Sequence, residues 1–192
     1  MAATRPLLRI ATAMLVVILT VASAACSKTQ RVGEGDPDVD AARRFERHPL
    51  LWAGERFEGW ELERIDLHAA EFVTFSYGTC ELEVPADGGC AVPLQIQVQP
   101  LCTHLRTVAR NPIWRRREIR GAPVGTIDGA PVLFTDRVQV KVYRGQGADA
   151  GVPLRAIRAL RSINEVPPVV GRDDAIPAPP EAVLAGREPC RA

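Results

Sequence analysis

Apolar and polar residues alternate along several short segments of this chain. In segment 94–99, Leu, Ile and Val alternate with three glutamines, and in segment 138–143 three valines alternate with polar residues. A period of two places one set of side chains on one face of a sheet, whereas a helix would spread them around its surface. We therefore predict strands at 94–99 and 138–143. Segment 71–77 follows the same pattern and predicts another strand, and segment 62–67 is a further candidate strand.

Residues 124–143 predict a three-stranded antiparallel meander. Val124–Ile127 and Val132–Thr135 flank the dipeptide Asp128-Gly129, which suits the positive φ angles of a tight hairpin turn. Pro131 falls at the start of a strand, where its missing N–H costs least.

One segment has the periodicity of an amphipathic helix. After Gly151, the residues Leu154, Ile157 and Leu160 recur at helical spacing, with Ile163 as a further member and arginines beside them. A shorter helix at 103–110 would end before Asn111-Pro112. These patterns predict an α+β fold, in which a small antiparallel sheet of about five to six strands carries one packed amphipathic helix and is stapled by disulfides.

The N-terminal segment has the order of charges and apolar residues that is typical of a signal peptide. Arg5 and Arg9 precede the apolar run Ile10–Val21, and small residues follow up to Cys26. This pattern predicts export from the reducing cytoplasm. Ser23-Ala24-Ala25-Cys26 resembles the lipobox of bacterial lipoproteins. The resemblance implies cleavage before Cys26, acylation of that cysteine, and a membrane partner through this N-terminal lipid anchor on the outer face of the cytoplasmic membrane.

Two other interpretations of this segment remain open. Cleavage after Ala22-Ser23-Ala24 would give ordinary secretion. An uncleaved membrane anchor is disfavoured, because the strongly apolar part is shorter than the roughly 20 residues of a spanning helix.

The composition divides the chain into four segments. We predict a signal peptide at 1–25, a flexible tether at 26–48, a globular domain at 49–165 and a proline-rich tail at 166–192. Trp52-Ala53-Gly54 and Phe75-Ser76-Tyr77-Gly78-Thr79-Cys80, with Gly89-Cys90, resemble exported domains of high-GC Gram-positive bacteria. That resemblance implies no particular activity.

Besides Cys26 the chain has four cysteines, an even number that in an exported protein predicts two disulfides. Of the three connectivities we favour Cys80 with Cys90, which flank a turn-rich segment, and Cys102 with Cys190. The same thiols together with His104 are ligand types for zinc. The tight spacing of a zinc motif is absent, so we predict neither a metal nor a cofactor.

Charge gives a limited indication of partners. The chain has 24 Lys and Arg residues against 23 Asp and Glu residues, so bulk charge predicts no nucleic-acid partner. The densest cluster of basic residues suits anionic lipid headgroups, cell-wall polymers or an acidic partner in the envelope. The alternative is a solvated face. The members of this predicted anion-binding patch are Arg106, Arg110, Arg115, Arg116 and Arg117.

No motif in the sequence assigns a catalytic residue. Asp66 and His68 would share a face of one strand, as an orienting carboxylate and a general base do. Ser76 lacks the surrounding glycines of an esterase nucleophile. We therefore expect a membrane-anchored binding or structural module at the cell surface, with a secreted hydrolase of wall or lipid material as the alternative.

Overall fold

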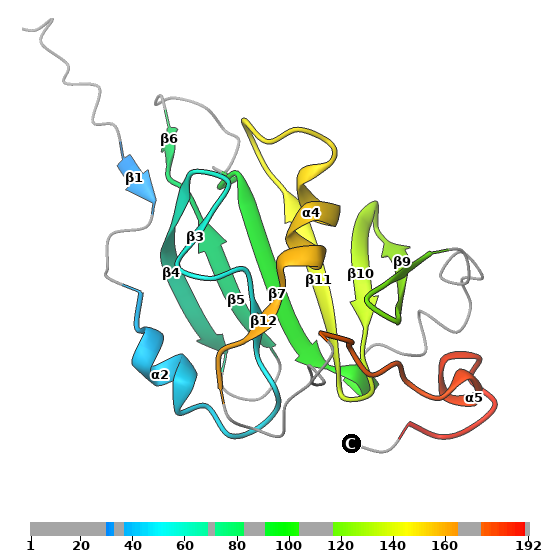
Figure 1. Ribbon diagram of the computed structural model, residues 1–192. Coiled ribbons are helices and arrows are strands. Elements are labelled where there is room, and N and C mark those ends of the chain that lie inside the picture. Colours follow the sequence, from blue (N-terminus) through cyan, green and yellow to red (C-terminus); the bar gives the residue numbers. More distant parts are fainter. Residues whose placement is uncertain are drawn as a thin grey trace, which may run out of the picture.

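In a computed structural model of the 192-residue chain, the described residues are 30–32, 37–68, 72–82, 91–103, 117–164 and 174–190. They form a curled antiparallel sheet with short helices around it (Figure 1). The strands are β1 (Gln30–Val32), β2 (Leu51–Trp52), β3 (Arg56–Phe57), β4 (Trp60–His68), β5 (Phe72–Tyr77), β6 (Cys80–Leu82), β7 (Leu94–Pro100), β8 (Glu118–Ile119), β9 (Ala122–Ile127), β10 (Ala130–Phe134), β11 (Val138–Arg144) and β12 (Arg161–Ser162). The helices are α2 (Val39–Arg43), α4 (Val152–Ala159), α5 (Glu181–Leu184) and the 3-10 turn η1 (Leu101–Thr103).

The predicted α+β class is confirmed, but the predicted size of the sheet is wrong. The main sheet has eight strands in the order β3-β4-β5-β7-β11-β10-β9-β8, instead of five to six. The strands predicted at 71–77, 94–99, 124–127, 132–135 and 138–143 are present, and the candidate strand at 62–67 lies within β4. The two additional strands, β3 and β8, have two residues each, which is too short for an alternating pattern to appear in the sequence. Short strands at both ends also limit the exposed sheet edge.

The predicted meander is confirmed as β9–β10–β11. Ala130 pairs with Ile127 across the hairpin, and Asp128 and Gly129 have φ angles of 51° and 78°. The left-handed region is open to glycine and tolerated by aspartate, so this dipeptide closes the turn without strain.

The main sheet has two chemically different faces. We call the face that carries Phe75 and Val140 the core face, and the face that carries Gln97 and Lys141 the opposite face. Strand register aligns the apolar side chains, because Phe75 pairs with Ile96 and Val140 with Val98. The core face therefore forms a continuous apolar surface across the central strands.

Helix α4 and the β2–β12 ribbon contribute to the core-face cluster. Figure 1 shows α4 and β12 in front of the main sheet. In α4 the side chains of Ala156 and Ile157 are fully buried, which confirms the predicted amphipathic helix. The helix ends at Ala159, earlier than the sequence pattern suggested, because Leu160 turns to an extended conformation and Arg161 pairs with Trp52. Within the segment predicted as a tether, Ala42 of α2 is fully buried in the same cluster.

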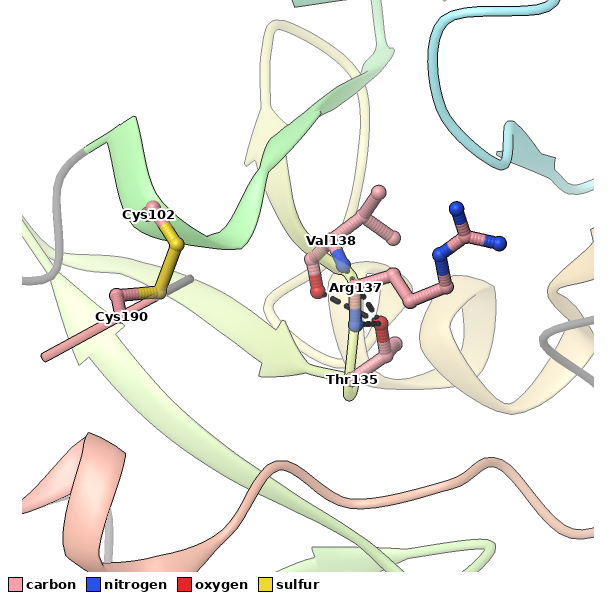
Figure 2. The surroundings of a disulfide bond; sticks show 5 residues. All are labelled: Cys102, Thr135, Arg137, Val138 and Cys190. Carbon is pink, nitrogen blue, oxygen red and sulfur yellow. Dashed lines mark hydrogen bonds between the residues drawn. A yellow bond between two sulfur atoms is a disulfide. The ribbon is translucent and has the colours of Figure 1, made fainter. Parts of the chain in front are cut away.

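Residues 174–190 pack against both faces of the sheet. Ile176 belongs to the core-face cluster, whereas Leu184 of α5 packs with Val132 and Phe134 of the opposite face. A disulfide between Cys102 and Cys190 ties this segment to η1, as predicted (Figure 2). The other predicted bridge, Cys80 with Cys90, lies outside the side chains that the structure describes.

Candidate ligand-binding cleft

An open cleft of about 640 Å³ lies where the first turn of α4, the β9–β10 hairpin and the end of β11 meet. Pro153 and Leu154 of α4 supply apolar lining, and Asp128 of the hairpin turn supplies a carboxylate. Tyr143 and Arg144 line the cleft from the last residues of β11. The cleft therefore combines an apolar wall with charged and hydrogen-bonding groups, as ligand sites commonly do.

A polar network runs from the cleft onto the opposite face. Lys141 Nζ lies 3.1 Å from Asp128 Oδ2 and 4.9 Å from the centre of the Tyr143 ring. The Tyr143 hydroxyl donates a hydrogen bond to Gln97 Oε1 at 3.0 Å. The Lys141 side chain is 10% exposed. Burial opposes the charge of Lys141, but its interactions with Asp128 and Tyr143 outweigh burial and raise the pKa of the ammonium group. Lys141 is therefore a permanent cation beside the cleft.

Two arginines of the cleft have exposed side chains that are not engaged in ion pairs among the described residues, unlike Arg120 and Arg155 nearby. Arg155 is paired with Glu58 and Asp149, and Arg120 donates to the carbonyl oxygen of Asp174 at 2.6 Å. By contrast, the exposed side chains of Arg117 and Arg144 have no ion pair or hydrogen bond in the described part of the chain. Their guanidinium groups remain available to an anion, which they can bind in a bidentate manner.

The opposite face also buries polar atoms without partners. Gln139 is fully buried, and among the described residues neither its amide nitrogen nor its amide oxygen has a hydrogen-bond partner. The Ser76 hydroxyl, on a side chain that is 2% exposed, is also without one. Each such group costs about 1–3 kcal/mol of stability. Desolvation of these polar groups therefore opposes the stability that apolar packing supplies.

Only one member of the predicted anion-binding patch lies in the described residues. Arg117 precedes β8 and lines the cleft. Arg106, Arg110, Arg115 and Arg116 lie outside the described residues. Cys26, the predicted lipid attachment site, also lies outside them.

Asp66 and His68, the candidate catalytic pair of the alternative hydrolase, contact other residues instead of each other. Arg64 Nε donates a hydrogen bond to the Asp66 carboxylate at 2.8 Å. The His68 ring lies 4.3 Å from the ring of Phe72. No hydrogen bond joins Asp66 to His68 within the described ranges. The arrangement therefore does not orient His68 as a general base.

Within the described ranges, no cluster of His, Cys, Asp and Glu side chains could hold a metal ion. His104, the imidazole of the zinc alternative, lies outside these ranges. The described helices are all too short or too polar to cross a membrane.

Sequence reasoning missed most of the cleft. Lys141 and Tyr143 were recognisable only as polar positions of a strand, and Asp128 only as a turn residue. The signal that could have pointed to them is the lysine within an otherwise uncharged run, since a buried lysine needs a partner. The partner, Asp128, can be identified only from the folded meander, in which the two side chains come together.

Comparisons of this chain with known protein families, curated proteins and solved structures found no match.

Proposed function

We propose that this protein is an exported lipoprotein that is anchored to the outer face of the cytoplasmic membrane through Cys26 and binds an anionic ligand in the cleft. The N-terminal segment with its lipobox supports the anchor. The Cys102–Cys190 disulfide is consistent with export, because structural disulfides persist in oxidising compartments.

The observation that carries the binding proposal is the pair of unpaired guanidinium groups, Arg117 and Arg144, in one cleft. Lys141 at its border balances the Asp128 carboxylate of the lining, so the two arginines give the cleft its positive charge. A ligand with phosphate groups matches this arrangement, since phosphate oxygens accept the parallel N–H groups of arginine. Phosphate-bearing polymers of the cell envelope are accordingly the ligand class that we propose.

Substitution of the two arginines tests the proposal. Binding of poly(glycerol phosphate) to the full chain should weaken about fivefold for Arg117→Gln and for Arg144→Gln, which corresponds to about 1 kcal/mol each. Binding should also weaken as salt is added, because exposed charges are screened. Calorimetric titration measures both effects.

Arg44→Gln is the matched control, because Arg44 is an exposed arginine at the end of α2 and does not line the cleft. Equal affinity of all three variants and the wild-type chain would overturn the binding proposal.

The anchor has a separate test. The intact mass of the protein extracted from its native membrane should correspond to a chain that begins at an acylated Cys26. A chain without acyl groups, cut after Ala24, would contradict the anchor and leave the cleft proposal to its own test.

A further inference from the structure

A second open pocket, of about 420 Å³, lies beside the candidate ligand-binding cleft and shares Arg117 with it. Ile119 of β8 and Arg158 in the last turn of α4 line this second pocket, which we call the side pocket. Neither Ile119 nor Arg158 lines the cleft. Arg117 therefore stands at the junction of the cleft and the side pocket.

The cleft and the side pocket follow one another along the same two walls. On α4, Leu154 lines the cleft and Arg158 lines the side pocket. These two residues are four positions apart, so they share one face of the helix and lie about 6 Å apart along its axis. On the other wall, Val124 of β9 lines the cleft, and its N–H donates a hydrogen bond to the carbonyl oxygen of Arg117. The two pockets are therefore consecutive parts of one groove between α4 and the β8–β9 pair.

The two walls of the groove are held together by Arg120, which follows β8 and lines the side pocket. Its guanidinium group donates a hydrogen bond to the carbonyl oxygen of Leu160 at the end of α4 and is paired with the carboxylate of Asp174. The Arg120 side chain is only 14% exposed. It thus fixes the end of α4 against the β8–β9 turn, so the groove exists before a ligand binds. A preformed groove reduces the entropy cost of binding.

The charges along the groove favour an extended anion. The exposed side chain of Arg158, like those of Arg117 and Arg144, has no ion pair or hydrogen bond in the described part of the chain. Among the described residues, Glu118 is the one acidic member of the side-pocket lining. Arg144 lies in the cleft, Arg117 at the junction and Arg158 in the side pocket. Three uncompensated guanidinium groups therefore follow one another along the groove.

We propose that a phosphate polymer binds along the whole groove, with one phosphate group between Arg144 and Arg117 and a following one between Arg117 and Arg158. This inference rests on the proposed function and specifies the form of its ligand, an extended chain with repeated phosphate groups. Arg117 can contact both phosphates, because a guanidinium group has five N–H donors. The separation of about 6 Å along α4 is one that a single glycerol unit between two phosphates spans. Once the first phosphate is bound, the second contact is intramolecular, so affinity rises with chain length.

Amide NMR titrations with ligands of defined length test this inference on the full chain in detergent micelles. The probes are glycerol 3-phosphate, which has a single phosphate, and a glycerol phosphate hexamer. The hexamer should shift the amides of Gly129 in the cleft and Ile119 in the side pocket with the same concentration dependence, because one molecule occupies both. It should also bind more tightly than glycerol 3-phosphate.

Variants of the side pocket separate the groove from the cleft alone. Arg158→Gln should weaken hexamer binding about fivefold and leave the response of Gly129 to glycerol 3-phosphate unchanged. Arg158→Lys keeps the charge and should recover part of the affinity. Glu118→Gln should strengthen hexamer binding, because it removes the acidic group of the lining. Arg44→Gln is the matched control, since Arg44 is exposed and lines neither pocket.

The groove and the proposed function can fail separately. Wild-type affinity of Arg158→Gln for the hexamer, or an Ile119 amide that the hexamer leaves unshifted, would overturn the groove and leave the cleft proposal, which depends on Arg117 and Arg144. Weaker binding of Arg158→Gln to phosphatidylglycerol vesicles, together with wild-type affinity for the hexamer, would also overturn it and would assign Arg158 to a membrane surface.

Discussion

The two faces of the main sheet are built from the same strands but bury different chemistry. On β5, Val73, Phe75 and Tyr77 are fully buried on the core face. The residues between them, Thr74 and Ser76, are 5% and 2% exposed on the opposite face. The core face gains stability from buried apolar area, whereas the opposite face also buries polar atoms that have no partner within the described part of the chain.

The difference teaches where to look for function in this molecule. Apolar packing on the core face accounts for the fold, and its elements were predictable from period-two alternation. Unpaired polar groups oppose stability, and such departures from good packing are expected near functional sites. The Lys141–Asp128 pair connects the opposite face to the cleft with its two unpaired arginines.

The largest expected loss of stability comes from removing apolar packing on the core face. Phe75→Ala removes a fully buried ring that packs beside Trp52, with ring centroids 6.3 Å apart. The free energy of unfolding should fall by about 3–5 kcal/mol. Denaturant unfolding measures the change. Thr74→Ala on the opposite face of the same strand is the control, and an equal loss there would show that the two faces contribute alike.

Removal of the disulfide tests whether α5 depends on this bridge to stay packed on the opposite face, while α4 on the core face does not. Cys102 and Cys190 are 88 residues apart, and the bridge holds the segment that carries α5 against the opposite face. Substitution of both cysteines by serine should cost about 2–4 kcal/mol of stability. Hydrogen exchange should accelerate in residues 181–190, because a four-residue helix is not stable alone. Amides of α4 should keep their protection. Faster exchange in α4 than in α5 would contradict this assignment.

Gln139→Met should raise the free energy of unfolding, whereas the two changes above lower it. The substitution replaces an amide that has no hydrogen-bond partner by an apolar side chain of similar length. We expect the free energy of unfolding to rise by about 1 kcal/mol, because the desolvation cost of the amide disappears. Thermal or denaturant unfolding provides the measurement. A loss of stability would show that the amide has a hydrogen-bonding role on the opposite face.

The smallest expected effect is the dependence of stability on pH that His48 causes. Burial lowers the pKa of His48 in the folded protein below the unfolded value of 6.5, with the Val98 backbone opposing and Arg47 assisting the shift. The unfolded chain therefore binds more protons in the window below pH 6.5. Stability should fall as pH decreases through that window, down to the folded pKa of His48.

His48→Gln removes this contribution and should flatten the pH dependence of unfolding in the window below pH 6.5. An unchanged slope in this variant would show that other groups cause it.

Much of the fold was predictable because it rests on local patterns. The alternation in β7 and β11, the Asp128-Gly129 turn and the pairing of Cys102 with Cys190 all agree with the structure. The number of strands was not predictable, because β3 and β8 form only through pairing with neighbours that the sequence does not identify.

The candidate site was predictable only in part, because it depends on contacts between distant residues. Arg117 was identified by its place in an arginine cluster. Arg144 is isolated in sequence, and only the register of the meander and the position of α4 bring it into the same cleft. The buried state of His48 likewise depends on Val98 and Asn164, which are 50 and 116 residues away in the sequence.

The most direct test of the account is an amide NMR titration of the full chain with poly(glycerol phosphate). We predict saturable shifts at cleft residues such as Gly125, Gly129 and Arg144, and their loss in the Arg117→Gln/Arg144→Gln double variant. A titration that leaves these residues unshifted, or shifts that persist in the double variant, would contradict the assignment of the cleft as the anion-binding site.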